Sequence, residues 1–190
     1  MNIEYLDIVT KDNKPTTQTA KRDDVHAQGL WHRTSHVWIL REHNNRMQVL
    51  LQKRAQNKDS FPGQYDTSSA GHIVAGTTPR ISAVRELEEE LGLSVKPDDL
   101  QYIGQFKHQF RGVFHDKPFI DNEYTYVYIY SGNVDINTLT LQSEEIEFVK
   151  WFDVRTVKHS IDQLNKHICI TNNAFHVLLE HLKTMKGDKL

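Results

Sequence analysis

The sequence feature that most constrains the fold is a segment at residues 77–91 with clear helix boundaries. Thr77 or Thr78 can act as its N-cap, and Pro79 stands near the first helical position. Gly92 follows the last helical residue and suits a helix end. Four aliphatic residues fall on one side of this helix, so it has to pack against another layer. They are Ile81, Val84, Leu87 and Leu91.

Segments with strand character lie on both sides of this helix. Alternating, apolar or aromatic residues predict strands at 3–8, 36–41, 48–53, 67–74, 101–109, 123–131 and 147–152. A second helix is predicted at 172–185, where apolar residues recur at helical spacing. This order predicts a single mixed α/β layered domain over residues 1–190, in which residues 1–29 form an N-terminal β extension.

Composition excludes several classes of protein. The 190 residues include 23 Lys and Arg against 25 Asp and Glu, so no global positive charge favours binding of a nucleic acid polymer. The single cysteine, Cys169, excludes a disulfide framework. The apolar runs are too short to span a membrane and the N-terminus lacks a signal-peptide pattern, so we expect a soluble, cytoplasmic protein.

The helix at 77–91 also carries a cluster of acids. Glu86, Glu89 and Glu90 are spaced i, i+3 and i+4, on the side opposite the aliphatic residues. Like charges at this spacing repel by a few tenths of a kcal/mol per pair, roughly, and a divalent cation would reverse that effect. Arg85 precedes Glu89 by one turn and can orient a carboxylate. The alternative interpretation is an ordinary solvated helix face.

The segment GHIVAGTTPRISAVRELEEELGL, which begins at Gly71, resembles the Nudix box, G-x5-E-x7-R-E-U-x-E-E-x-G-U, where U is a bulky aliphatic residue. The half with the pattern R-E-U-x-E-E-x-G-U is complete. The departure is Thr77, which stands where the pattern has Glu. Over residues 4–154 the chain is also similar to the Nudix subgroup of isopentenyl-diphosphate isomerase, through WHRTSHVWIL, LLQKRAQNKDSFPGQYDTSSAGH and EEIEFVKWF.

This resemblance implies the Nudix fold, an α/β/α sandwich around a mixed sheet. It also implies hydrolysis, with Mg²⁺ or Mn²⁺, of a small molecule in which a diphosphate is linked to another moiety. Glu89 and Glu90 are then metal ligands, Glu86 is a further ligand or the base, and Arg85 is the orienting residue. The backbone carbonyl of Ala70 is a further candidate ligand.

Four residues outside the helix are candidate substrate contacts: Arg54, His72, Glu123 and Glu145. Arg54 matches a basic position of the subgroup and is expected to meet a substrate phosphate. Glu86, Glu123, Glu144 and Glu145 are the candidates for the general base.

Two alternatives remain at the level of sequence. An isomerase would need a cysteine directly before the Gly-His pair, and Ala70 stands there, although His32 and His72 match the histidines of the isomerase metal site. The replacement at Thr77 leaves open a non-catalytic, nucleotide-binding Nudix domain. The apolar stripe of the helix at 172–185 predicts packing on the sheet or a contact in a homodimer.

Overall fold

The fold is taken from a computed structural model that describes residues 3–58, 60–114 and 116–186. The strands are β1 (Tyr5–Val9), β2 (Pro15–Lys21), β3 (Trp31–His43), β4 (Arg46–Arg54), β5 (Tyr65–Asp66), β6 (Ser69–His72), β7 (Gln101–Phe114), β8 (Lys117–Tyr130) and β9 (Ile146–Asp153). The α-helices are α1 (Arg22–Gln28), α2 (Pro79–Leu91), α3 (Val154–Asp162) and α4 (Asn172–Lys186). Two 3-10 turns are η1 (Pro97–Asp99) and η2 (Ile136–Thr138).

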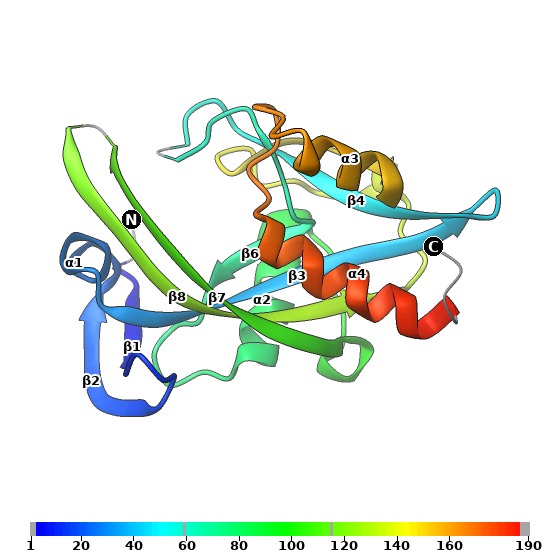
Figure 1. The fold of residues 1–190 in the computed structure, drawn as a ribbon. Helices are drawn as coiled ribbons and strands as arrows, with labels where there is room; N and C mark the ends of the chain where they lie inside the picture. Colours follow the sequence, from blue (N-terminus) through cyan, green and yellow to red (C-terminus); the bar gives the residue numbers. More distant parts are fainter. Residues whose placement is uncertain (1–2, 59, 115, 187–190) are drawn as a thin grey trace.

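Seven strands form one mixed sheet, in which β3 is central (Figure 1). Its neighbour β8 runs parallel to it, whereas β4 and β6 pair with it antiparallel, β6 along its first half and β4 along its second. Strand β9 pairs with β4, and β7 forms a long hairpin with β8. The predicted strands are therefore present, with β3, β7 and β8 several residues longer than expected.

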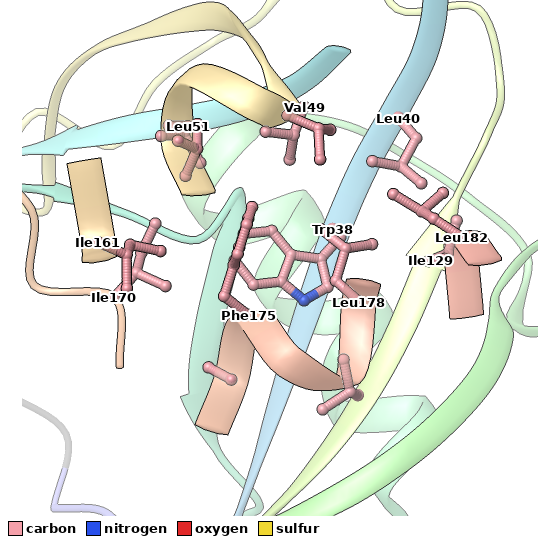
Figure 2. Packing of buried hydrophobic residues seen from close by; sticks show 14 residues of the cluster. Trp38, Leu40, Val49, Leu51, Ile129, Ile161, Ile170, Phe175, Leu178 and Leu182 are labelled. Carbon is pink, nitrogen blue, oxygen red and sulfur yellow. The ribbon is translucent and has the colours of Figure 1, made fainter. Parts of the chain in front are cut away.

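Each face of the sheet is covered by helices, which gives the α/β/α sandwich. On the face of α3 and α4, the core holds fully buried Trp38, Phe175, Leu178 and Leu182 (Figure 2). The ring centroids of Trp38 and Phe175 are 5.8 Å apart in an edge-to-face arrangement. On the opposite face, α2 packs Ala83, Leu87 and Leu91 onto β3 and β4. The α/β class and the α/β/α sandwich expected from the sequence are confirmed.

Helix α2 begins and ends where its sequence predicts. The Thr78 hydroxyl accepts a hydrogen bond from the Ile81 N–H, and Pro79 is the first helical residue. Gly92 adopts φ 63°, and its N–H bonds to the carbonyl of Glu88. The predicted division of α2 into a packed aliphatic side and an opposite acidic side was wrong at two residues. Ile81, placed on the packed side, is 48% exposed, whereas Glu90, placed on the acidic side, is only 6% exposed. Glu86 and Glu90 lie against β6, whereas Glu89 is exposed to solvent.

The N-terminal extension contains more than strands. Strands β1 and β2 form an antiparallel hairpin, as expected, but residues 22–28 form the short helix α1, which the sequence analysis did not predict. Leu6, Ile8 and Val25 make a small core of their own at this end of the sheet. Residues 1 and 2 of the extension lie outside the described part of the chain. Helix α3 was also missed, whereas α4 lies where it was predicted and packs on the sheet.

Among the described residues, no helix is both long enough and apolar enough to cross a membrane.

Candidate active site

A pocket of about 330 Å³ opens between α2, the first part of β3, β6 and the β7–β8 hairpin. All the predicted acids of α2 line it, as do Arg85, Ala70 and the four candidate substrate contacts. Glu144 is exposed and does not line the pocket, which removes it from the candidates for the general base.

Two of the three carboxylates of α2, those of Glu86 and Glu90, are shielded from water, whereas that of Glu89 is exposed. Burial is the largest cause that raises the pKa of Glu90 to about 8 and that of Glu86 to about 7, and the charges of nearby acids add to it. The Ala70 N–H donates to Glu90 Oε2 at 3.3 Å. Arg85 pairs with Glu86, lies 3.8 Å from Glu89 and donates to the His72 carbonyl at 3.1 Å. A cation would be favoured here because it offsets the repulsion among the acids.

Gly71 leaves room on β6 for the side chain of Glu86 from α2. A Cβ atom built at this position would overlap the carboxyl group of Glu86. The backbone of β6 therefore forms the floor under the acidic side of α2, and the first glycine of the box has a steric role.

A second set of potential metal-ligating side chains lies at the wall of the same pocket, with fully buried His32 directly behind it. One nitrogen from each of His26, His32 and His72 falls within 4.8 Å of the others, and the same limit holds for His32, Asp121 and Glu123. Burial lowers the pKa of His26 to about 3 and that of His32 to about 4, so these rings are neutral near pH 7 and have a lone pair available.

Two buried polar atoms of this set lack hydrogen-bond partners. His32 Nε2 and Asp121 Oδ1 are buried, lie 3.6 Å apart and find no hydrogen-bond partner among the described residues. Burial and the Asp121 charge also raise the pKa of Glu123 well above its ordinary value. Neutral imidazoles beside buried carboxyl groups are suitable ligands for a divalent cation. Without such a partner, the burial of these polar groups would cost free energy.

Cationic side chains face these acids. Arg54 is held by Asp66 at 3.0 Å and by the Ser60 carbonyl at 2.9 Å, and Lys58 pairs with Glu145. Arg22, on α1, is half-exposed at the pocket. A pocket that is lined by both acids and cationic side chains has groups that could hold cations and groups that could attract a phosphate-bearing molecule.

Phenylalanines form one rim of the pocket. The rings of Phe61 and Phe110 are 5.8 Å apart, and Phe119 stacks on His26 at 4.5 Å. Phe61 comes from the loop after β4, and the others come from the β7–β8 hairpin. Phe61 has φ 51°, a conformation that bulky residues rarely adopt, so the surrounding structure holds it in place.

Sequence reasoning missed several pocket residues: Glu4, Arg22, His26, Lys58 and Asp121. Three of these come from the N-terminal extension, which has no recognisable active-site motif. Asp121 stands two residues before Glu123, so both side chains leave the same face of β8, and that spacing was the signal for it.

The family is established by comparison with known proteins. A family model described as the NUDIX domain matches residues 30–169. The chain belongs to the NUDIX domain family. An uncharacterized Nudix hydrolase of Clostridium acetobutylicum is 36% identical over 168 residues, which cover 88% of this chain and 75% of that protein. Nudix hydrolase 3 of Arabidopsis thaliana is 43% identical over 150 residues, which cover 78% of this chain but 19% of the plant protein. The chain therefore spans about a fifth of that relative.

Solved structures agree on the fold. DR0079 of Deinococcus radiodurans has a TM-score of 0.66 at 17% identity, with 93% of this chain and 98% of that chain covered. An Ap4A hydrolase of C. elegans has a TM-score of 0.55 at 16% identity, with 82% and 98% covered. The comparisons do not support the narrower resemblance to isopentenyl-diphosphate isomerase, since the relatives by sequence are Nudix hydrolases.

Proposed function

We propose that this NUDIX-family protein hydrolyses a small-molecule diphosphate linked to another moiety, with Mg²⁺ or Mn²⁺ as cofactor. The observation that carries the proposal is the convergence, in one pocket, of buried acids from α2 and β8 with the cations Arg22, Arg54 and Lys58. Such a pocket can neutralise a diphosphate and hold the cations that hydrolysis of a phosphoanhydride requires.

Glu86, Glu89 and Glu90 would hold one cation, with the Ala70 carbonyl as a further candidate ligand. The second set, built on His32, would hold another. The cations supply charge neutralisation and lower the pKa of bound water. Arg85 orients the carboxylates of Glu86 and Glu89, and Gly71 leaves room for the first of them.

Arg54 is the best-positioned contact for a substrate phosphate, because Asp66 and Ser60 fix its guanidinium in the pocket wall. His72 and Glu145 line the same space. The acceptor of the proton from the attacking water would be a pocket carboxylate, and Glu86, Glu123 and Glu145 remain the candidates.

The phenylalanine rim favours a moiety with an apolar or flat surface beside the diphosphate, such as a nucleobase or an isoprenoid chain. The NUDIX domain of Shewanella oneidensis NrtR, a structural neighbour, is complexed with ADP-ribose, which contains both a diphosphate and a nucleobase.

The isomerase alternative is disfavoured because Ala70 offers no thiol acid. A binding-only domain has no physical need for three acids in the pocket wall. We further propose a cytoplasmic protein that binds no nucleic acid polymer and has the α4 side available for a homodimer contact.

The test is a panel of diphosphate compounds with Mg²⁺ or Mn²⁺, in which the products, phosphate monoesters and inorganic phosphate, are separated and measured by chromatography. It includes ADP-ribose, dinucleotides, nucleoside diphosphate sugars, thiamine diphosphate and prenyl diphosphates. The proposal is supported if the protein hydrolyses at least one compound and if the rate falls by orders of magnitude in the variants Glu89→Gln and Glu90→Gln. Cation binding without turnover of any compound would favour the binding-only alternative.

A further inference from the structure

Two buried hydroxyl groups stand directly beside the metal-ligating set built on His32, and the proposed reaction gives them no role. Thr34 is 5% exposed and Thr125 is fully buried. They are partners in the parallel pairing of β3 and β8, two residues after the pair formed by His32 and Glu123. Because residues two apart share a face of a strand, both threonines lie on the face that carries the metal-ligating groups.

The two hydroxyl groups form a chain of hydrogen bonds that ends on the Glu123 carboxylate. Thr34 Oγ1 donates to Thr125 Oγ1 at 2.9 Å, and Thr125 Oγ1 donates to Glu123 Oε1 at 3.2 Å. A hydroxyl group has one proton to donate, so the Thr125 proton goes to the carboxylate and the Thr34 proton goes to Thr125. The chain therefore restrains the direction in which the Glu123 side chain points.

The groups beside this carboxylate have atoms free for a cation. One atom from each of His32, Asp121 and Glu123 lies within 4.8 Å of the others. The Nδ1 atom of fully buried His32 lies 3.1 Å from the Leu30 carbonyl, which can only accept, so in the neutral ring Nδ1 carries the proton and Nε2 has the lone pair. Within the described part of the chain neither His32 Nε2 nor Asp121 Oδ1 has a hydrogen-bond partner. These unpartnered buried atoms point to a cation independently of the acids on α2.

The threonines mark the boundary between this polar set and the core. Further along the same face of β3 and β8, buried Trp38 and Val127 belong to the apolar cluster under α3 and α4. Valine has nearly the shape of threonine and suits a buried strand position, so packing alone does not require two hydroxyl groups here.

We propose that Thr34 and Thr125 are positioning residues that aim the Glu123 carboxylate at the cation site formed with His32 and Asp121. Ligands of a metal are commonly oriented by hydrogen bonds from the residues behind them, and loss of such a bond weakens metal binding. This role rests on the proposed function, in which the set built on His32 holds the second cation. Thr34 acts through Thr125, so its hydroxyl matters only while that of Thr125 is present.

The test is a Zn²⁺ titration of the full chain against a chromophoric chelator, because imidazole ligands favour Zn²⁺ whereas Mg²⁺ prefers oxygen ligands alone. Asp121→Ala removes a ligand of this set only, so the Zn²⁺ site that this variant weakens is the site to be followed. Thr125→Val removes the hydroxyl at nearly constant shape and should weaken Zn²⁺ binding at that site by about tenfold. Thr125→Ser keeps the hydroxyl and should bind Zn²⁺ nearly as wild type does.

A double-mutant cycle tests the chain of hydroxyl groups itself. Thr34→Val should weaken Zn²⁺ binding by less than Thr125→Val, and the double variant should bind as Thr125→Val alone does. Ser68→Ala is the matched control, because Ser68 is fully buried but does not line the pocket. Its hydroxyl donates to the Leu50 carbonyl at 2.6 Å and accepts from the Ile39 N–H at 2.8 Å. Its loss should lower the unfolding temperature without a change in Zn²⁺ affinity.

Equal Zn²⁺ affinity in wild type and Thr125→Val would overturn the positioning role, as would a loss that Thr125→Ser does not restore or additive losses in the double variant. So would equal Zn²⁺ binding by wild type and Asp121→Ala, since the set would then hold no ion. The positioning role and the proposed function can fail separately. If no diphosphate is hydrolysed but Thr125→Val still weakens Zn²⁺ binding, the positioning role stands and hydrolysis does not. If hydrolysis depends on Glu90 but Thr125→Val binds Zn²⁺ as wild type does, only the positioning role fails.

Discussion

The replacement Glu90→Gln should stabilise the cation-free protein at high pH while it abolishes function. Glu90 is 6% exposed, and burial raises its pKa from the ordinary 4.5 to about 8. In the unfolded chain the carboxyl group ionises near pH 4.5, whereas the folded protein resists that ionisation until about pH 8. The wild type therefore keeps the stability due to neutral Glu90 below pH 4.5 and loses it as the pH rises to about 8.

The size of the effect follows from that interval. A difference of one pKa unit corresponds to about 1.4 kcal/mol, so the interval between 4.5 and about 8 sets an upper limit of about 5 kcal/mol at pH 8 and above. The amide of Gln at position 90 does not ionise, so the variant does not lose this stability, and its oxygen can still accept a hydrogen bond from the Ala70 N–H. For a domain of this size about 1 kcal/mol shifts the unfolding temperature by about 2–4 °C. We expect Glu90→Gln to unfold several degrees above wild type at pH 8 and close to wild type at pH 4.5.

Thermal unfolding across this pH range, with a chelator present, measures the effect. Glu88→Gln is the control, because Glu88 lies exposed on the same helix and its replacement should change little at any pH. Adding Mn²⁺ should stabilise the wild type by about 2.7 kcal/mol at a hundredfold excess over Kd, and it should raise the unfolding temperature of Glu90→Gln by less. If Glu90→Gln is less stable than wild type at pH 8 without cations, the reasoning from burial is refuted.

Three further changes test other parts of the structure. Gly71→Ala should displace the Glu86 carboxylate and reduce Mn²⁺ affinity and turnover by about tenfold or more, and unchanged Mn²⁺ binding by calorimetry would contradict this. Phe110→Ala should raise KM for nucleoside or prenyl diphosphates but leave that for methyl diphosphate unchanged; an equal rise for all would refute a role in selecting the moiety. Leu178→Ala should lower the free energy of unfolding in urea by about 2–5 kcal/mol, whereas the exposed Met185→Ala should have little effect, and similar losses in both would be inconsistent with the core described.

The elements that the sequence predicted well are those with local signals. Helix α2 carries its own start at Thr78 and Pro79 and its own end at Gly92, so its bounds do not depend on the rest of the fold. The strands were recognised from β-prone residues, but β7 and β8 extend further because each continues to pair with the other beyond the sheet. Helix α1 was missed because its seven residues bury only Val25 and His26, too few for a helical period.

The burial of Glu90 could not be read from the helix alone. A wheel separates one apolar side from one polar side, which assumes that the polar side meets water. In this structure α2 packs its aliphatic residues on the sheet and Glu86 and Glu90 against β6, where Gly71 leaves room for Glu86. The tertiary contact that buries Glu90 is the one that the periodic pattern did not reveal.

The histidine and acid set illustrates the other limit. His26, His32 and His72 come from α1, β3 and β6, and they converge because β6 pairs antiparallel with β3 while α1 packs at the start of β8. Scattered along the sequence they had no metal-binding spacing, and only the register of the sheet brings them together. The same register places Glu123 beside His32, since these residues are partners in the parallel pairing of β3 and β8. A site assembled across parallel strands depends on the topology of the sheet, which single-sequence periodicity does not encode, whereas the carboxylates of α2 depend only on a helix. This difference explains why the pocket-lining residues of α2 were all named from the sequence, whereas His26 and Asp121 were not.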